Sequence, residues 1–387
     1  MKRNAILLFL AGAMIWVSMY VYVPVLPAYA KTLGATESAI GLISGMYGLL
    51  PIFLCIVLGY LAGRLGRDKL LLIAGMVIVI VSGLVFLLTN NVAGLFVARA
   101  ISAAGSAWWV IFCSTYAKFV PEDQEVKGQG QISFSANLGK MIGCVCCIFA
   151  SQGLAYKRNF VVAIVAGAVG VIFLALMGGH KGRSGVHAER LSIKEEFALM
   201  KNKDIIFFGI LGLLSQMISF AVPTTFTPVA AQKIGADSTD LSLIQLVYVT
   251  VVGFTSLIAG TKFYEKVGGI RMLAFSFILG DISCVQQFYE QMWLIYVMQI
   301  LSGYCYGVSL AALSGFVVSG VPKLDRSGAL GVFQSIYSIG IFVGPTLTGV
   351  LMEKFSFSFA YWFFAGVSVL AAVLCPLMVP KKYAHMT

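Results

Sequence analysis

Residues 70–89 read LLLIAGMVIVIVSGLVFLLT, a run without a single charged side chain. A helix of about 20 such residues is long enough to cross the hydrocarbon core of a bilayer. The strands of outer-membrane barrels alternate between apolar and polar residues instead. The run therefore predicts a membrane-spanning helix and excludes a barrel strand.

Runs of the same kind recur along the whole chain. The others cover residues 5–29, 38–62, 92–118, 130–152, 160–178, 205–231, 239–262, 270–289, 292–318, 328–352 and 358–378. The 387 residues are 59% hydrophobic and 11% charged, whereas a soluble domain carries roughly 25% charged residues. This composition excludes a soluble protein and a nucleic-acid binder despite the net charge of +11. We predict an all-α membrane protein with twelve transmembrane helices.

The basic residues predict the orientation of these helices. Most of the 27 lysines and arginines fall in the loops on the side of the N-terminus. The opposite side holds Lys31, Lys157, Arg158, Lys233 and Lys354, and only Arg99 and Lys140 lie inside spans. Because lysine and arginine collect in cytoplasmic loops, both termini are predicted to be cytoplasmic, in the inner (cytoplasmic) membrane of a cell.

An internal repeat divides the chain into two halves. At an offset of about 201 residues, landmarks of the first half coincide with the second: Pro27, Gly34, Tyr47, Pro121, Gly139 and Gly143 match Pro228, Gly235, Tyr248, Pro322, Gly340 and Gly344. We predict a six-helix bundle at 1–178 and a second at 205–387. The linker at 179–204 is predicted to carry a short amphipathic helix on the cytoplasmic surface, with a plain flexible linker as the alternative.

The loop after the second span carries a family signature. It reads GYLAGRLGRDK over residues 59–69 and resembles the GxLaDRxGRxxx motif of the major facilitator superfamily, in the same place. Leu95-x-x-x-Arg99 followed by Gly105 is similar to the arginine motif in the fourth helix of many proton-linked members. The resemblance covers essentially the whole chain and implies two six-helix pseudo-repeats around a central site.

The resemblance also implies a cytoplasmic gate. Its residues here would be Gly59, Gly63, Arg64, Gly66, Arg67 and Asp68, with Glu265, Lys266 and Gly268 in the second half. In the family, an aspartate at the position of Gly63 helps to hold the cytoplasmic gate closed. In this chain the contact from the first half is therefore either weak or made by Asp68 instead. Helix five has Gly139-x-x-x-Gly143 without the proline typical of drug antiporters, which argues against that subclass.

Polar side chains form stripes along several predicted spans. Steps of three and four residues place them on one helix face, and they are Arg99, Ser102, Ser106 and Trp109 in helix four, Asn137 and Lys140 in helix five, Gln216 in helix seven, Gln299, Ser302 and Tyr306 in helix ten, Gln334 and Ser338 in helix eleven, and Tyr47 and Tyr248 in helices two and eight. In the family these helices line the central cavity, so we predict a substrate site. Hydrogen bonding between helices is the alternative for each residue.

The charges inside the spans indicate the kind of substrate. The first-half stripes hold Arg99 and Lys140 and no carboxylate, and an excess of positive charge in a low-dielectric cavity favours an anion. Asp281 is the only carboxylate well inside a span. It is either a proton-coupling residue or a structural partner.

We therefore predict a secondary active transporter that exports a small organic anion or anionic amphiphile by alternating access. A proton or a counter-anion could be coupled, and the chain is predicted to act as a monomer. A multidrug/proton antiporter is the alternative, and a non-transporting receptor or scaffold is a further one. The sequence has no HExxH and no GxxxxGK[ST] motif, so we predict no enzyme activity, metal site or cofactor.

Overall fold

The computed structural model describes residues 2–61, 67–120, 125–178, 199–256, 268–284, 291–322 and 326–377, and the regular structure in these ranges is helical throughout. The elements are α1 (Lys2–Tyr20), η1 (Val23–Val25), α2 (Leu26–Thr32), α3 (Glu37–Leu49), α4 (Pro51–Leu61), α5 (Asp68–Leu88), α6 (Val92–Ala107), α7 (Trp109–Ala117), α8 (Glu125–Ala150), η3 (Gln152–Leu154), α9 (Lys157–Ala175), α11 (Lys203–Ser219), η4 (Phe220–Phe226), α12 (Thr227–Lys233), α13 (Ser238–Ser256), α15 (Gly269–Ser283), α16 (Met292–Ser319), α17 (Arg326–Lys354) and α18 (Phe357–Leu377).

The predicted membrane spans are confirmed. Within the described ranges, eleven helices or helix pairs are long and apolar enough to cross a bilayer, and α15 supplies a shorter apolar helix at the ninth position. The predicted ninth span extends to residue 289, and its last residues lie outside the described ranges. The boundary between the halves also stays a prediction, because residues 179–198 of the linker are not among the described ones.

The first and seventh spans are interrupted at corresponding places. In the first, α1 ends at Tyr20 and a short 3-10 turn with Pro24 leads into α2. In the seventh, α11 runs into the π-helical turn η4, which contains Pro223. Proline has no amide hydrogen to donate and clashes with the preceding turn, which explains why a proline lies at each interruption. In the seventh span the π turn leaves the carbonyl oxygens of Ser219, Val222 and Pro223 to accept hydrogen bonds from side chains.

Glycines of the repeat hold corresponding helices close together. A β-carbon on Gly139 of α8 would lie 2.2 Å from the carbonyl oxygen of Ala13 in α1, and one on Gly340 of α17 would lie 2.1 Å from that of Leu213 in α11. The glycine spacings Gly139-x-x-x-Gly143 and Gly340-x-x-x-Gly344 therefore allow close approach of helices in both halves. Each half is built on the same helix pair.

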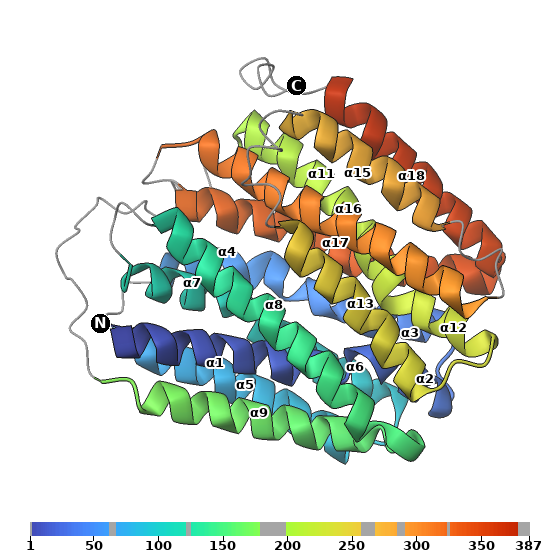
Figure 1. Cartoon of the computed structure of the whole chain (residues 1–387), viewed down its shortest axis with the longest axis horizontal. Helices are drawn as coiled ribbons and strands as arrows, with labels where there is room; N and C mark the ends of the chain where they lie inside the picture. Colours follow the sequence, from blue (N-terminus) through green and yellow to red (C-terminus); the bar gives the residue numbers. More distant parts are fainter. Residues whose placement is uncertain are drawn as a thin grey trace.

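Figure 1 shows the first-half helices on one side of the molecule and the second-half helices on the other, with α8 and α13 side by side between them. A further contact between the halves joins α3 and α4 to α17, and smaller ones join η1 to α13, α3 to η4 and α2 to α12. Exposed large apolar side chains are most numerous on α5 and α18, and α8, α9, α15 and α16 also carry several. These helices present an apolar outer face, as expected of helices that contact lipid.

The two halves also touch at the end of the molecule opposite to the chain termini, which we call the far end. There the hydroxyl of Ser238 donates a hydrogen bond of 2.9 Å to the carbonyl oxygen of Ser151. The backbone amide of Ser38 donates one of 3.1 Å to a carboxylate oxygen of Glu353. Both bonds join one half to the other, so the far end is closed in this conformation.

Candidate functional site

Arg99 is the more deeply buried of the two cations inside the spans. Its side chain, on α6, is only 3% exposed. The guanidinium carbon lies 4.3 Å from the ring centre of Tyr47 and 5.9 Å from that of Tyr22. Its Nε and Nη1 atoms have no hydrogen-bond partner among the described residues. Aromatic faces stabilise the charge by about 2 kcal/mol or more when it is desolvated, but no described carboxylate neutralises it.

Lys140 lies near the middle of α8 in a different aromatic setting. Its Nζ atom is 4.4 Å from the ring centre of Trp16 and 5.2 Å from that of Tyr20, both in α1. The side chain is half-buried and makes no ion pair with a described residue. Trp109 meets Trp16 edge-on with ring centres 5.5 Å apart. The cation therefore lies on an aromatic wall supplied by the first half.

The repeat-related tyrosines each reach the opposite half. Tyr47 of α3 stacks on Phe220 of η4, with ring centres 6.0 Å apart. Tyr248 of α13 packs in one cluster with Cys144, one turn beyond Lys140, and this cluster also contacts Tyr20 and Tyr306. These contacts bring residues predicted from both repeats to the surface between the halves.

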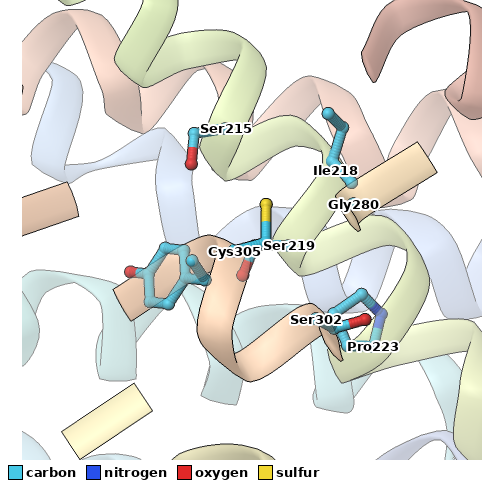
Figure 2. A pocket seen from close by; sticks show the side chains of 8 residues that line it. Ser215, Ile218, Ser219, Pro223, Gly280, Ser302 and Cys305 are labelled. Carbon is cyan, nitrogen blue, oxygen red and sulfur yellow. The ribbon is translucent and has the colours of Figure 1, made fainter. Parts of the chain in front are cut away.

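The second half contributes hydroxyl groups instead of charges. The hydroxyls of Ser219 and Tyr248 share a hydrogen bond of 2.5 Å, and Gln216 donates one of 3.1 Å to the hydroxyl of Tyr306. Figure 2 shows a small cavity beside them, lined by Ser215, Ser302 and Cys305 among others. Its volume of about 10 Å³ is room for about one water molecule. A larger molecule could enter only if the halves moved apart.

Other residues of the predicted stripes hold the scaffold together. Ser102 shares a hydrogen bond of 2.8 Å with the hydroxyl of Tyr22, and Ser106 and Ser338 donate to carbonyl oxygens of their own helices. Gln299 donates a bond of 3.1 Å to the carbonyl oxygen of Pro223, a group freed by the π turn. Ser102 and Gln299 thus make hydrogen bonds between elements, the kind that we considered as the alternative, whereas the bonds of Ser106 and Ser338 stay within one helix. The two remaining stripe residues, Asn137 and Gln334, are half-buried, and Asn137 faces Gly253 of α13.

The predicted gate lies mostly outside the described residues, which omit Gly63, Arg64, Gly66, Glu265 and Lys266. Gly59 lies in the last turn of α4, and Arg67 is exposed just before α5. Asp68 forms an ion pair with Lys118, which follows α7 in the same half. Gly268 has a φ of 94°, as expected of a turn glycine. The side chain of Asp281, in α15, is likewise not among the described ones, so its role stays a prediction.

The site also contains residues that the sequence argument missed. Trp16 and Tyr20 contact Lys140, and Tyr22 contacts Arg99. The signal was present, because Trp16 and Tyr20 are four residues apart and share a helix face. The predicted stripes contained no residue of the first span, whose apolar run has no charged or amide side chain beside these aromatic ones. Phe220 was missed because nothing in the sequence marked the π turn.

Two helical halves, lipid-facing outer helices and a polar surface between the halves define a polytopic membrane protein of the transporter type. The chain belongs to the Major Facilitator Superfamily, whose family model matches residues 8–230 and again 208–386. It is therefore a transporter of this superfamily and not an enzyme. The predicted family and fold are confirmed; which termini face the cytoplasm stays a prediction.

Relatives and solved structures of this superfamily match almost the whole chain. An MFS-type transporter of Methanocaldococcus jannaschii is 22% identical, over 92% of this chain and 93% of its own length. The quinolone resistance protein NorA of Staphylococcus aureus strain COL is also 22% identical, over 91% of each chain. The nucleoside transporter NupG has a similar structure, with a TM-score of 0.75, 16% identity and coverage of 97% of this chain and 98% of its own. The human organic anion transporter MFSD10 has a similar structure, with a TM-score of 0.67 and 14% identity. The match covers 97% of this chain and 99% of MFSD10.

Proposed function

We propose that this transporter exports a small organic anion or an anionic amphiphile by alternating access of a site between its two halves. The observation that carries the proposal is Lys140. It is a half-buried cation at mid-span, held against the rings of Trp16 and Tyr20 and paired with no described carboxylate. A positive charge in a low-dielectric setting attracts an anion strongly.

The surroundings of Lys140 suit an organic anion with an apolar or aromatic body. Trp16 and Trp109 supply ring faces from the first half, and Tyr248 and Tyr306 from the second. Aromatic side chains provide a large contact area with a polar tip. The acid group would bind the first half while the body contacts both, and rocking of the halves would expose the site to either side of the membrane.

The relatives support the direction of transport. The similarity to quinolone resistance proteins along 91% of the chain favours export. One structural neighbour is an organic anion transporter, although this likeness is one of fold. The same resistance proteins favour the second candidate, a multidrug/proton antiporter. In that mechanism binding of the cargo expels a proton, whereas an anion at Lys140 would favour proton uptake.

A thermal-stability screen tests the proposal. Purified protein is heated with a panel of organic anions, cations and neutral compounds, because a ligand of the folded state raises Tm by mass action. We expect anions to raise Tm and Lys140→Met to weaken their binding by about 30-fold or more, since losing one partner of a desolvated charge pair costs about 2–5 kcal/mol.

Lys354→Met is the matched control, because Lys354 is exposed at the end of α17. It should bind the same anions with unchanged affinity. Stabilisation by cations alone, or unchanged anion affinity in Lys140→Met, contradicts the proposal. Proton release on binding of the cargo in weak buffer would favour the antiporter. Flux of the best ligand in proteoliposomes of known orientation then gives the direction.

A further inference from the structure

Tyr306 borders the space between the two halves at mid-span. It lies near the middle of α16, and its ring stacks on that of Tyr248 with ring centres 6.2 Å apart, in the cluster that holds Cys144 of the first half. Its side chain is only partly buried, whereas Ser302 and Ser309, on the same helix face, are buried. That face therefore does not contact lipid, and the accessible part of Tyr306 opens inward.

The hydroxyl of Tyr306 keeps an unused hydrogen-bond donor. The amide nitrogen of Gln216 donates a bond of 3.1 Å to the hydroxyl oxygen, so the hydroxyl is the acceptor there and its own proton has no acceptor among the described residues. The amide oxygen of Gln216 also has no described partner, but Gln216 is only 2% exposed and out of reach of a ligand. The accessible unused group of this pair is therefore the phenol proton, which binds an acceptor.

The pair of Gln216 and Tyr306 stays together while the halves move. Both residues belong to the second half, in α11 and α16, and these helices pack against each other. Lys140 belongs to the first half, and Tyr20, whose ring centre is 5.2 Å from the Nζ atom of Lys140, packs against the same cluster as Tyr306. A cargo whose acid group binds Lys140 would therefore place its body beside Tyr306.

We propose that Tyr306, held by Gln216, selects cargo that carries a hydrogen-bond acceptor on its body, such as a carbonyl or ether oxygen, in addition to the acid group. This selection rests on the proposed function and narrows the substrate class to organic acids with such an oxygen. A cargo without the acceptor would leave the phenol proton buried and unsatisfied once the halves close around it, which costs free energy. A site built to bond one group rejects an analogue that lacks it.

The neighbouring hydroxyls of the second half are already engaged. Those of Ser219 and Tyr248 share a hydrogen bond, and that of Ser309 donates to the carbonyl oxygen of Cys305. With the halves closed, the small cavity that Tyr306 helps to line has room for about one water molecule. An acceptor on the cargo would replace such a water molecule and reproduce its bond to the phenol proton.

Matched pairs of aryl carboxylates test this selection by calorimetric titration of the purified full-length protein. The first pair is para-acetylbenzoate and para-isopropylbenzoate, and the second consists of the corresponding biphenyl carboxylates, which reach further from the acid group. The acetyl and isopropyl groups have nearly the same shape, but only the acetyl group has an acceptor oxygen. We expect Tyr306→Phe to lower the ratio of acetyl to isopropyl affinity by about 2–12-fold in at least one pair, the range for one neutral hydrogen bond.

Control variants separate the hydroxyl of Tyr306 from its surroundings. Tyr304→Phe should keep the affinity ratio, because Tyr304 lies two residues earlier in α16 and on a different helix face. The double variant Tyr306→Phe with Gln216→Leu removes both polar partners together, which is nearly neutral for stability. It should lower the ratio as Tyr306→Phe does, and it decides the matter if Tyr306→Phe alone does not fold. Lys140→Met should weaken both compounds of a pair equally.

An affinity ratio that Tyr306→Phe leaves unchanged in both pairs overturns the inference, and equal weakening of both compounds would show that Tyr306 only packs against the cargo. A ratio that falls as much in Tyr304→Phe would overturn it too. If Lys140→Met leaves every affinity unchanged while Tyr306→Phe still lowers the ratio, the acceptor site stands and the anion site at Lys140 does not. If no compound of either pair binds, both proposals fail.

Discussion

Substitution of Gly41 by alanine should open the far end of the molecule. Gly41 lies in α3 of the first half, and a β-carbon there would be 2.2 Å from the carbonyl oxygen of Pro345 in α17 of the second half. Ordinary van der Waals contact begins at 3.4 Å, so this distance is about 1.2 Å too short. The obstacle is backbone, so no side-chain rotation relieves it. The halves themselves must move apart.

The size of the effect follows from the overlap. Overpacking of this kind costs roughly 1–3 kcal/mol. The helix propensity of alanine, about 1 kcal/mol better than that of glycine, is the same in both conformations and cancels from their ratio. The overlap exists only when the far end is closed. A cost of 1–3 kcal/mol therefore shifts the equilibrium toward the open conformation by about 5–150-fold.

Gly139→Ala is the matched control. A β-carbon at Gly139 also lies 2.2 Å from a backbone oxygen, that of Ala13, but both residues belong to the first half. This overlap is present in either conformation. Gly139→Ala should therefore lower Tm without changing the separation of the halves.

Electron-spin distance measurement separates the two outcomes. Labels at cysteines replacing Arg158 and Phe355, both exposed at the far end of opposite halves, report the separation. None of the eight described native cysteines is exposed, which limits background labelling. We expect a longer distance component in Gly41→Ala only. If Gly41→Ala keeps the wild-type distances and merely loses stability like Gly139→Ala, the contact between α3 and α17 is fixed packing and not a gate.

Three further variants test individual residues. Asp281→Asn should uncouple transport from a pH gradient in proteoliposomes if Asp281 carries the coupled proton, and flux that survives under the gradient assigns it a structural role. Asp68→Asn and Lys118→Met should each lower the free energy of unfolding by about 0.2–1 kcal/mol, the usual contribution of a partly exposed ion pair. In a double-mutant cycle, additive losses would show that the two residues are not coupled. Gln299→Leu should cost about 1–3 kcal/mol, because it leaves the carbonyl oxygen of Pro223 buried without a donor, and a Tm equal to that of the wild type would contradict this.

The sequence predicts the class of protein and the spans because the bilayer imposes them. A helix needs about 20 apolar residues to cross the bilayer, and runs such as residues 70–89 meet this requirement. The repeat also predicts local geometry: Gly34 and Gly235 both follow the end of a helix with positive φ values of 82° and 94°. These features depend on residues close together in the chain.

The site is predicted less completely because it depends on contacts between distant residues. Helical spacing puts Ser102 on the same face as Arg99, but the spacing does not show that the hydroxyl of Ser102 is bonded to Tyr22. The pair of Asp68 with Lys118 joins residues 50 positions apart, and the loop motif gives no sign of it. The π turn at Phe220–Phe226 supplies Pro223 to the wall of the small cavity in the second half, and a single proline in a span does not predict a π turn.

The two halves share a scaffold but not a chemistry. Gly139 and Gly340 make the same close contact in each half. However, the position equivalent to Lys140 in the second half is Ile341, and the position equivalent to Arg99 is Gln299. Both cations inside the spans therefore belong to the first half, and the second half offers amides and hydroxyls. An anion that binds this molecule would keep its charge on the first half through the whole cycle, while the second half moves across its neutral part. Because the electrostatic contact need not be broken when the halves rock, the barrier to rocking would depend on the weaker polar and aromatic contacts of the second half.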